Sequence, residues 1–410
     1  MQARQAALAL LDAVLREHRM LAQVRVSAQG AEAARASRLA TTILRNLGQA
    51  DAVLRPYLDR KPSLPVQNLL RLGTVELLLN GEDAHGVTDD LVSIAKSRGG
   101  TRRAAGMVNA VLRKIAAEGP AAWDQGSPQR LPGWIAKPLT KRLSTDTIRA
   151  IEAVQARPAP LDITPRDPDL DLPGATRLPT GSLRISDNVQ VSALPGYDAG
   201  AFWVQDAAAA LPVRLLGDVA DKRVLDLCAA PGGKTMQLAA AGADVTALDV
   251  SPARMKRVTE NLARTGLTAK LVTEDAFDHT ERYDAILLDA PCTASGTIRR
   301  HPDLPFLKSG RDVEPLTKLQ MRLLDHALTL LKPGGTLVYC TCSLLPVEGE
   351  FQITAALKRH EALQVIPTDP TTLGGSRDWA SPEGGLRLHP ALWADIGGMD
   401  GFYMAALRIA

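Results

Sequence analysis

From residue 221 onward, short apolar runs alternate with segments of helical periodicity. Strands that alternate with helices are typical of a parallel sheet covered by helices, so this pattern restricts the C-terminal half to the α/β class. We predict strands over residues 223–227, 244–248, 270–273, 285–289 and 336–340, a helix over 315–331, and a final edge strand over 402–409.

The first 118 residues have a different pattern. Leu8, Leu11 and Leu15 recur at helical spacing, and no proline occurs before Pro56, which predicts an all-helical unit. Six prolines then occur at positions 158, 160, 165, 168, 173 and 179, where they favour short extended segments. We therefore expect a helical domain over residues 1–120, a linker with a small α/β subdomain over 121–195, and an α/β domain over 196–410.

Charge is distributed unevenly along the chain. Residues 1–149 hold 22 Lys and Arg against 13 Asp and Glu, whereas residues 150–410 hold 26 against 32, so the net charges are +9 and −6. A basic helical segment indicates contact with phosphate groups, although a solvated helical surface would give the same balance.

Composition excludes several classes of protein. Aromatic residues are only 4%, which argues against a sheet that stacks nucleic-acid bases on Phe and Tyr. The four cysteines form no CxxC pair, which fits a reducing compartment. No apolar run approaches the ~18 residues of a membrane span, so we expect a cytoplasmic protein without a membrane partner.

Residues 224–235 combine a strand, a turn of small residues and a helix start. A phosphate loop requires glycine where Cys228 stands, and the GxGxxG pattern of dinucleotide-binding proteins is absent. The turn still allows a ligand to approach backbone amides at the carboxyl ends of the strands. A plain strand-to-helix turn is the alternative.

Three carboxylates follow three predicted strands. Asp249 ends the second strand, Asp275 follows the third and Asp289 ends the fourth. A single Asp after a strand is more often a turn or cap residue. Three of them beside a glycine loop suit a ribose, an adenine amine and a cationic sulfonium better than a polyphosphate.

Two cysteines follow neighbouring predicted strands. Cys292 comes after strand 285–289 and Cys342 after strand 336–340, so both are expected at one crevice. Cys228 and Cys340 lie within apolar runs and are expected to be small buried residues. The spacing of the four does not fit a zinc site, and we expect no metal.

Long segments of the chain resemble a known family. DLCAAPGGKT, DAPCTASGTIRRHPD, YCTCSLLPVEGE and GYDAGAFWVQDAA (196–208) resemble motifs of the S-adenosylmethionine-dependent RNA cytosine-5 methyltransferases of RsmB and NOP type. LATTILRNLGQAD, LLRLGTVELLL and GMVNAVLRKI resemble the NusB-like helical RNA-binding domain of RsmB-type proteins. The resemblance implies an all-α NusB-like domain, a small linker subdomain and an α/β Rossmann-like class I methyltransferase domain.

The resemblance also implies roles for individual residues. Cys342 would be the nucleophile and Cys292 would assist product release, although DNA cytosine methyltransferases attack with the cysteine of the Pro-Cys motif. Asp289 would hold the cytosine, and Lys234 would act as a base or polar anchor, with a solvated lysine as the alternative. The S-adenosylmethionine site would comprise Cys228, Ala229, Ala230, Pro231, Gly232, Gly233, Lys234, Asp249 for the ribose, Asp275 for the adenine, and Asp289.

RNA phosphates would be held by Arg299, Arg300, His301 and the helix-start residues Arg102 and Arg103. We expect a monomeric methyltransferase that acts on a cytosine of small-subunit (16S) ribosomal RNA. A tRNA cytosine-5 methyltransferase is the alternative within the class. A non-catalytic RNA-binding assembly factor and a zinc-binding module are alternatives from other classes.

Overall fold

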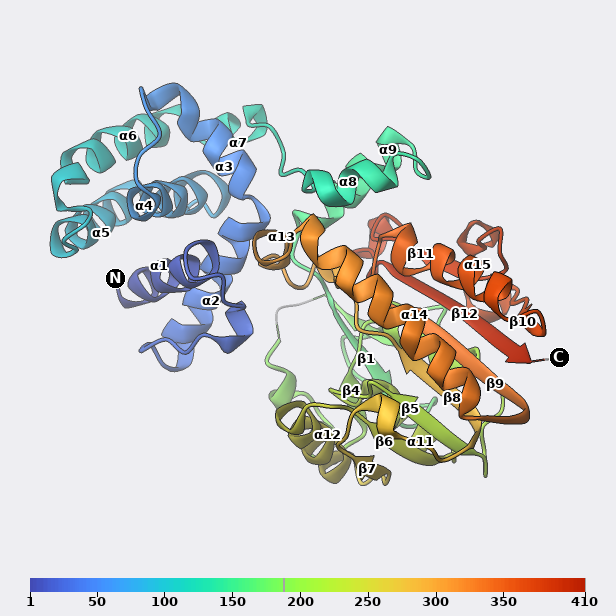
Figure 1. Ribbon diagram of the computed structural model, residues 1–410. Coiled ribbons are helices and arrows are strands. Elements are labelled where there is room, and N and C mark those ends of the chain that lie inside the picture. The colour runs from blue at the N-terminus through green and yellow to red at the C-terminus, as the bar shows by residue number, and fades with distance from the viewer. Residues whose placement is uncertain (187–188, 410) are drawn as a thin grey trace. The chain divides into compact units, whose positions relative to one another are not determined.

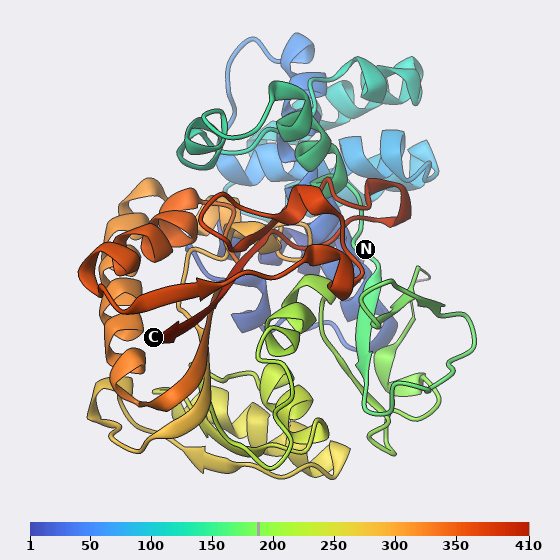
Figure 2. The ribbon, with the colours of Figure 1, turned by 90° about the vertical axis from the view of Figure 1, so that its right-hand side faces the viewer.

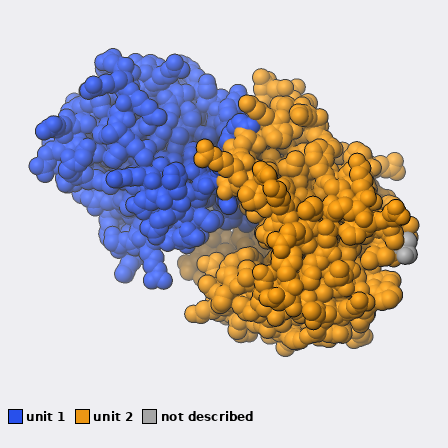
Figure 3. All heavy atoms as spheres, viewed as in Figure 1, with its two compact units in different colours: residues 1–133, 152–158, 298–309 blue, residues 134–151, 159–297, 310–410 orange. Residues whose placement is uncertain are grey.

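A computed structural model describes residues 1–186 and 189–409. The chain forms two compact units, which Figure 3 distinguishes by colour. Unit 1 comprises residues 1–133, 152–158 and 298–309, and unit 2 comprises 134–151, 159–297 and 310–410. The units therefore interleave along the chain, whereas we expected three consecutive domains.

Unit 1 is built from helices, as the leucine spacing and the lack of proline predicted. Its apolar stripes meet in one core, in which Leu8, Ile43, Leu91 and Leu112 are fully buried. The helices are α1 (Gln2–Leu15), α2 (Gly30–Arg45), α3 (Leu47–Leu54), α4 (Leu64–Thr74), α5 (Ala84–Ser97), α6 (Ala105–Glu118) and α7 (Ala121–Gln125).

A segment from the C-terminal half of the chain also belongs to unit 1. Residues 298–309 contain the short helix α13 (Leu304–Leu307), and Phe306 and Leu307 pack on the helical core. The Asp303 carboxylate accepts a hydrogen bond from the Leu21 backbone N–H at 2.9 Å. No local sequence pattern predicts that residues 298–309 belong to unit 1.

Unit 2 contains a small antiparallel sheet in the order β2-β3-β1-β4, as short extended segments between prolines predicted. The Arg184 guanidinium donates two hydrogen bonds of 2.7 Å to the buried Asp162 carboxylate and ties two of its strands together. The bounds are β1 (Leu161–Pro165), β2 (Thr176–Arg177), β3 (Leu183–Ile185) and β4 (Phe202–Val204). They are preceded in the chain by α8 (Gly133–Leu139) and by α9 (Thr145–Gln155), of which residues 152–155 belong to unit 1.

The main sheet of unit 2 runs in the order β10-β12-β9-β8-β5-β6-β7, with β11 paired to β12. Strands β5, β6, β7, β8 and β9 pair with one another in parallel. They confirm the five predicted strands, with bounds that differ by at most a few residues. Their bounds are β5 (Arg223–Leu227), β6 (Asp244–Leu248), β7 (Lys270–Val272), β8 (Tyr283–Asp289), β9 (Leu331–Thr341), β10 (Leu363–Ile366), β11 (Leu386–Leu388) and β12 (Phe402–Ile409).

One strand prediction was wrong. Residues 402–409 do form β12, but this strand lies inside the sheet, antiparallel to both β9 and β10. Its first six residues are buried, and the edge that we expected β12 to leave open is paired with β11 at residues 402–404 and with β10 at residues 406–409. The short strands β10 and β11 lack the long apolar runs by which the other strands were predicted.

Helices cover both faces of the main sheet (Figure 1). Helices α14 (Val313–Thr329) and α15 (Glu350–Arg359) pack on one face, against a core that includes Leu225, Leu288 and Tyr339. Helices α10 (Ala207–Arg214) and α11 (Gly233–Ala240) pack on the other face (Figure 2). Across the described residues, no helix combines the length and apolarity needed to cross a bilayer.

Candidate active site

The strand order places the predicted site residues at one edge of the main sheet. After β7 the chain crosses to the other side of β5 and continues in β8, so β5 and β8 flank the switch point at which open α/β sheets bind ligands. The loops after β5, β6, β8 and β9 leave from the same edge because these strands are parallel. Phe402 joins them because β12 runs antiparallel to β9.

The loop after β5 has the backbone that its small residues predicted. Gly232 has a φ of 99°, in the left-handed region, directly before α11. A Cβ atom there would lie 3.1 Å from Cγ1 of Val258 on α12 (Pro252–Thr265), so a side chain would push the loop away from that helix. Glycine therefore allows both the turn and the close approach.

Asp226, at the end of β5, carries an unusual carboxyl group. It is fully buried, its Oδ2 accepts a hydrogen bond of 2.5 Å from Thr235, and its Oδ1 is without a hydrogen-bond partner among the described residues. Burial raises the pKa of Asp226 to about 7, and the neighbouring Asp289 and Asp249 carboxylates add to that rise. A buried oxygen without a partner is a candidate contact for a ligand.

Asp249 and Asp275 lie in contrasting environments. The Asp249 carboxylate is buried and accepts hydrogen bonds from the Ala230 N–H at 3.2 Å and the Ser251 N–H at 3.0 Å. Asp275 is exposed and accepts a hydrogen bond from the Phe277 N–H at 3.0 Å, the cap arrangement that we gave as the alternative for a single Asp. Their contacts with ribose and adenine stay predictions.

Two side chains beside Asp249 were not foreseen. Val250 is 66% exposed, an apolar surface directly after the proposed ribose carboxylate. Arg254 Nη1 lies 3.3 Å from Asp249 Oδ2, and its Nη2 donates to the Ala230 carbonyl. An exposed valine and a surface arginine are too common for their sequence positions to single them out.

The loop after β5 lies in a negative electrostatic environment. Burial raises the pKa of the Cys228 thiol, and the carboxylates of Asp289, Asp249 and Asp226 raise it further. The same carboxylates would stabilise a cation held at this loop. The charges are compatible with the sulfonium of S-adenosylmethionine, with Lys234 and Arg254 paired to Asp289 and Asp249 beside it.

Lys234 and Asp289 form an ion pair at the centre of the site. The Lys234 Nζ lies 2.7 Å from Asp289 Oδ2 and 5.3 Å from the centre of the Phe402 ring. Burial lowers the pKa of Lys234, but the charge and hydrogen bond of Asp289, together with Cys340 and Asp226, outweigh burial, so the pKa lies above the ordinary value for lysine. The amine is therefore protonated at neutral pH, which favours the predicted anchor over the predicted base.

The structure brings the two predicted cysteines together. The Cys292 and Cys342 sulfur atoms lie 3.5 Å apart, and all four cysteines are free thiols. The hydrogen bond to Cys342 and burial raise the pKa of Cys292 well above the ordinary value for a thiol. Cys340 is fully buried, as expected, whereas Cys228 is only half-buried.

The predicted RNA-binding residues divide by exposure. Arg102, Arg103 and Arg300 are exposed, and His301 is half-buried. Arg299 is fully buried, and its carbonyl accepts a hydrogen bond of 3.0 Å from Arg45. The Arg299 side chain would have to be uncovered before it could contact a phosphate, and its role in RNA binding stays a prediction.

Comparison with known proteins agrees with this architecture. Residues 213–408 match the model of the 16S rRNA methyltransferase RsmB/F family, and residues 1–117 match the NusB family. Ribosomal RNA small subunit methyltransferase B of Salmonella arizonae is 34% identical and covers 89% of this chain and 88% of its own length. The protein of the same name from Erwinia tasmaniensis is 33% identical, with 97% and 96% covered.

Solved structures show the same fold. The crystal structure of PH0851 has a TM-score of 0.75 at 23% identity and covers 99% of this chain and 98% of its own. A methyltransferase homologue from Pyrococcus horikoshii has a TM-score of 0.53 at 27% identity, with 68% and 99% covered. The fold and the strand-end site thus define a Rossmann-like methyltransferase with a NusB-like helical domain. The chain belongs to the 16S rRNA methyltransferase RsmB/F family.

Proposed function

We propose that this protein is a methyltransferase that transfers a methyl group from S-adenosylmethionine to carbon 5 of a cytosine in 16S rRNA. The observation that carries the proposal is the 3.5 Å separation of the Cys292 and Cys342 sulfurs at the same sheet edge as the glycine loop. Membership of the RsmB/F family supports the choice of 16S rRNA.

Carbon 5 of cytosine is a weak nucleophile, so the ring must first become electron-rich. Addition of the Cys342 thiolate to carbon 6 would form a C–S bond and move an electron pair toward carbon 5, which then takes the methyl group. A base would then take the carbon-5 proton, the electron pair of that C–H bond would re-form the double bond between carbons 5 and 6, and the C–S bond would break to expel the Cys342 thiolate. The 3.5 Å separation of the two sulfurs supports this pairing of roles, because Cys292 would be close enough to protonate the Cys342 thiolate when that thiolate is expelled.

Asp289 and Lys234 would hold the cytosine during this addition. The Asp289 side chain is 30% exposed at the site and can accept a hydrogen bond from the exocyclic amine. The Lys234 ammonium, 2.7 Å away, fixes the orientation of the Asp289 carboxylate and balances its charge.

The cofactor would lie along the loop from Cys228 to Lys234. S-adenosylmethionine supplies an electrophilic methyl group when it is bound. The carboxylates of Asp249 and Asp289 would stabilise its positive charge, and exposed Val250 offers an apolar surface for its adenine. Asp249 would accept hydrogen bonds from the ribose, which requires the Arg254 side chain to share that carboxylate.

The test is methyl transfer to 16S rRNA that lacks modification, with labelled S-adenosylmethionine and bisulfite mapping of the product. Cys342→Ser should abolish transfer, because the hydroxyl is a far weaker nucleophile than a thiolate. Cys292→Ala should accumulate a covalent protein–RNA adduct, visible as a shifted band on a denaturing gel. An adduct in Cys342→Ser instead would exchange the two roles, and label in no cytosine would refute the proposal.

A further inference from the structure

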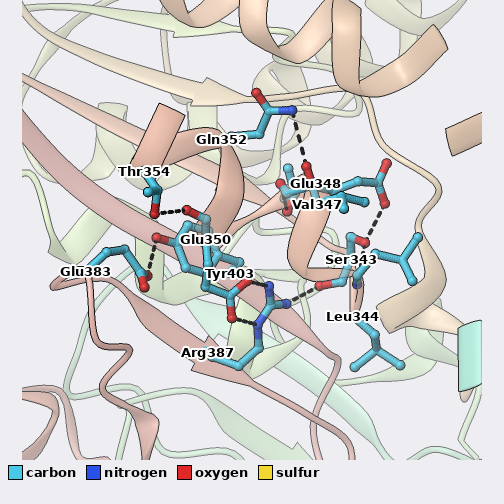
Figure 4. A network of polar contacts seen from close by, with 12 residues as sticks. Ser343, Leu344, Val347, Glu348, Glu350, Gln352, Thr354, Glu383, Arg387 and Tyr403 are labelled. Atoms are coloured by element: carbon cyan, nitrogen blue, oxygen red, sulfur yellow. Dashed lines mark hydrogen bonds and ion pairs between the residues drawn. The ribbon is translucent and has the colours of Figure 1, made fainter. Parts of the chain in front are cut away.

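A buried carboxylate joins the two loops that carry the cysteines, and Figure 4 shows its contact with Ser343 on one of them. Glu348 is fully buried behind β9. Its side-chain oxygens accept hydrogen bonds from the Thr293 N–H at 2.9 Å, the Gln320 amide at 3.1 Å, and the hydroxyls of Thr293 and Ser343. These donors come from the loop after β8, from α14 and from the loop after β9.

The contacts fall directly beside the two reactive sulfurs. Thr293 is the residue after Cys292, and Ser343 is the residue after Cys342. Because consecutive Cα atoms are held about 3.8 Å apart, a shift of either residue carries its cysteine with it. Glu348 therefore fixes the backbone beside one sulfur relative to the backbone beside the other.

Further contacts brace the same two loops. The Gln320 amide donates to the Pro291 carbonyl at 2.9 Å, on the other side of Cys292. The Ser295 hydroxyl accepts a hydrogen bond of 3.0 Å from the Leu344 N–H. Arg387, paired with Glu350, donates to the Ser343 carbonyl (Figure 4).

Burying a carboxylate such as Glu348 costs free energy that an apolar side chain of the same size would not. Removing it from water is unfavourable unless its lone pairs accept hydrogen bonds, and here four neutral donors supply them. An apolar side chain would fill the space without this requirement, but it would not bind both loops. A buried carboxylate at position 348 is therefore explained by its ability to hold the two cysteine loops in place.

We propose that Glu348 is the positioning residue that sets the distance between the Cys292 and Cys342 sulfurs. The inference deepens the proposed function and rests on it only for the use of these cysteines on cytosine. Glu348 itself contacts neither the cytosine nor the methyl donor in this proposal.

Disulfide formation between the two thiols measures their proximity without any methyl transfer. Diamide takes up the two electrons and two protons that the thiols lose as the S–S bond forms. In Glu348→Ala the loops lose their common partner, and we expect this reaction to slow by about tenfold or more, with a fall in kcat of about 100-fold. Affinity for S-adenosylmethionine should stay unchanged, because Glu348 does not contact the loop after β5.

The isosteric variant Glu348→Gln separates geometry from charge. Its amide oxygen can still accept from Thr293 N–H and Gln320, and the two hydroxyls can turn to accept from its NH2 group. We expect disulfide formation and kcat within about threefold of wild type. Glu383→Ala is the matched control, since Glu383 accepts a hydrogen bond from Tyr403 at 2.7 Å in the same network but contacts neither cysteine loop.

If Glu348→Ala does not fold, Ser343→Ala and Thr293→Val each remove one tether and should slow disulfide formation by a smaller factor. Unchanged disulfide formation in all of these variants would overturn the inference. So would loss of activity in Glu348→Gln with normal disulfide formation, since that pattern requires the charge. Failure of the wild type to methylate RNA would refute the proposed function, yet the diamide rates would still test the positioning.

Discussion

At the scale of single residues, the site depends on which acidic groups are ionised. Asp289 has a cation within 2.7 Å, whereas Asp226 is fully buried with a threonine hydroxyl at 2.5 Å. Two carboxyl groups near the ends of neighbouring strands, β5 and β8, thus have opposite surroundings. Asp289 could be predicted as a site residue because it ends a strand and precedes a cysteine. The sequence pattern does not predict that Asp226 is buried next to Thr235.

Asp226 makes the stability of the protein depend on pH. Its pKa is raised to about 7 by burial, so between pH 4 and 7 the folded state holds a proton that the unfolded state has released. The unfolded state binds fewer protons in this range, so stability falls as pH rises. Relative to Asp226→Asn, we expect wild type to lose about 1.4 kcal/mol of unfolding free energy per pH unit between about pH 5 and 7.

Urea denaturation of both proteins at several pH values measures this difference. The difference should level off above pH 7, where both states of the wild type are ionised. Parallel stability profiles for wild type and Asp226→Asn would contradict a raised pKa at this position.

At the scale of elements, the loop after β8 is pressed against the segment that enters β12. The Gly296 carbonyl accepts a hydrogen bond of 2.9 Å from the Gly401 N–H, and the Gly296 N–H donates to the Cys342 carbonyl at 3.0 Å. The position therefore connects the Cys292 loop, the Cys342 loop and β12. Sequence gave no reason to distinguish Gly296 from the other glycines.

Gly296→Ala should disrupt this junction. The added Cβ would lie 1.9 Å from the Gly401 carbonyl oxygen, so the backbone must move, and we expect a loss of about 2 kcal/mol or more of stability together with most of the activity. Gly106→Ala in α6 is the matched control, because its Cβ would meet no atom within 4 Å. Thermal denaturation and methyl transfer measure both effects, and equal behaviour of the two variants would contradict the argument.

The local pattern of apolar and polar residues predicted the individual strands, but not their order in the sheet. Strands β5 and β6 have the predicted bounds because each is a short, mostly apolar segment between turns, as expected of a buried parallel strand. The predicted edge position of β12 was wrong because the order of strands in a sheet depends on pairing between residues that are distant in the sequence. The same limit hid Trp379, which packs on the main sheet from a Gly- and Pro-rich stretch without apolar periodicity.

At the scale of the whole molecule, the division of charge corresponds to a division of tasks in the proposed function. The basic residues of the first 149 positions give RNA phosphates a partner, whereas the carboxylates near the glycine loop suit a cationic cofactor. Composition revealed this division, but not which basic side chains are exposed. Arg299 is buried, and Arg102 and Arg103 are not.

Replacing both Arg102 and Arg103 with Ala should weaken RNA binding while leaving affinity for S-adenosylmethionine unchanged. If each contacts one phosphate, the slope of log affinity against log salt should become shallower by about 1.4, since single-stranded RNA loses about 0.7 per phosphate contact. Filter binding at several salt concentrations measures the slope. An unchanged slope would place the RNA contacts elsewhere.

The segment 298–309 has a consequence for synthesis of the chain. Phe306 and Leu307 pack on the apolar core of a unit whose other residues lie at positions 1–133 and 152–158. N-terminal domains usually fold first as they leave the ribosome. Here the N-terminal unit cannot reach its final packing until translation has passed residue 309, by which time four strands of the main sheet, β5 to β8, have already been made.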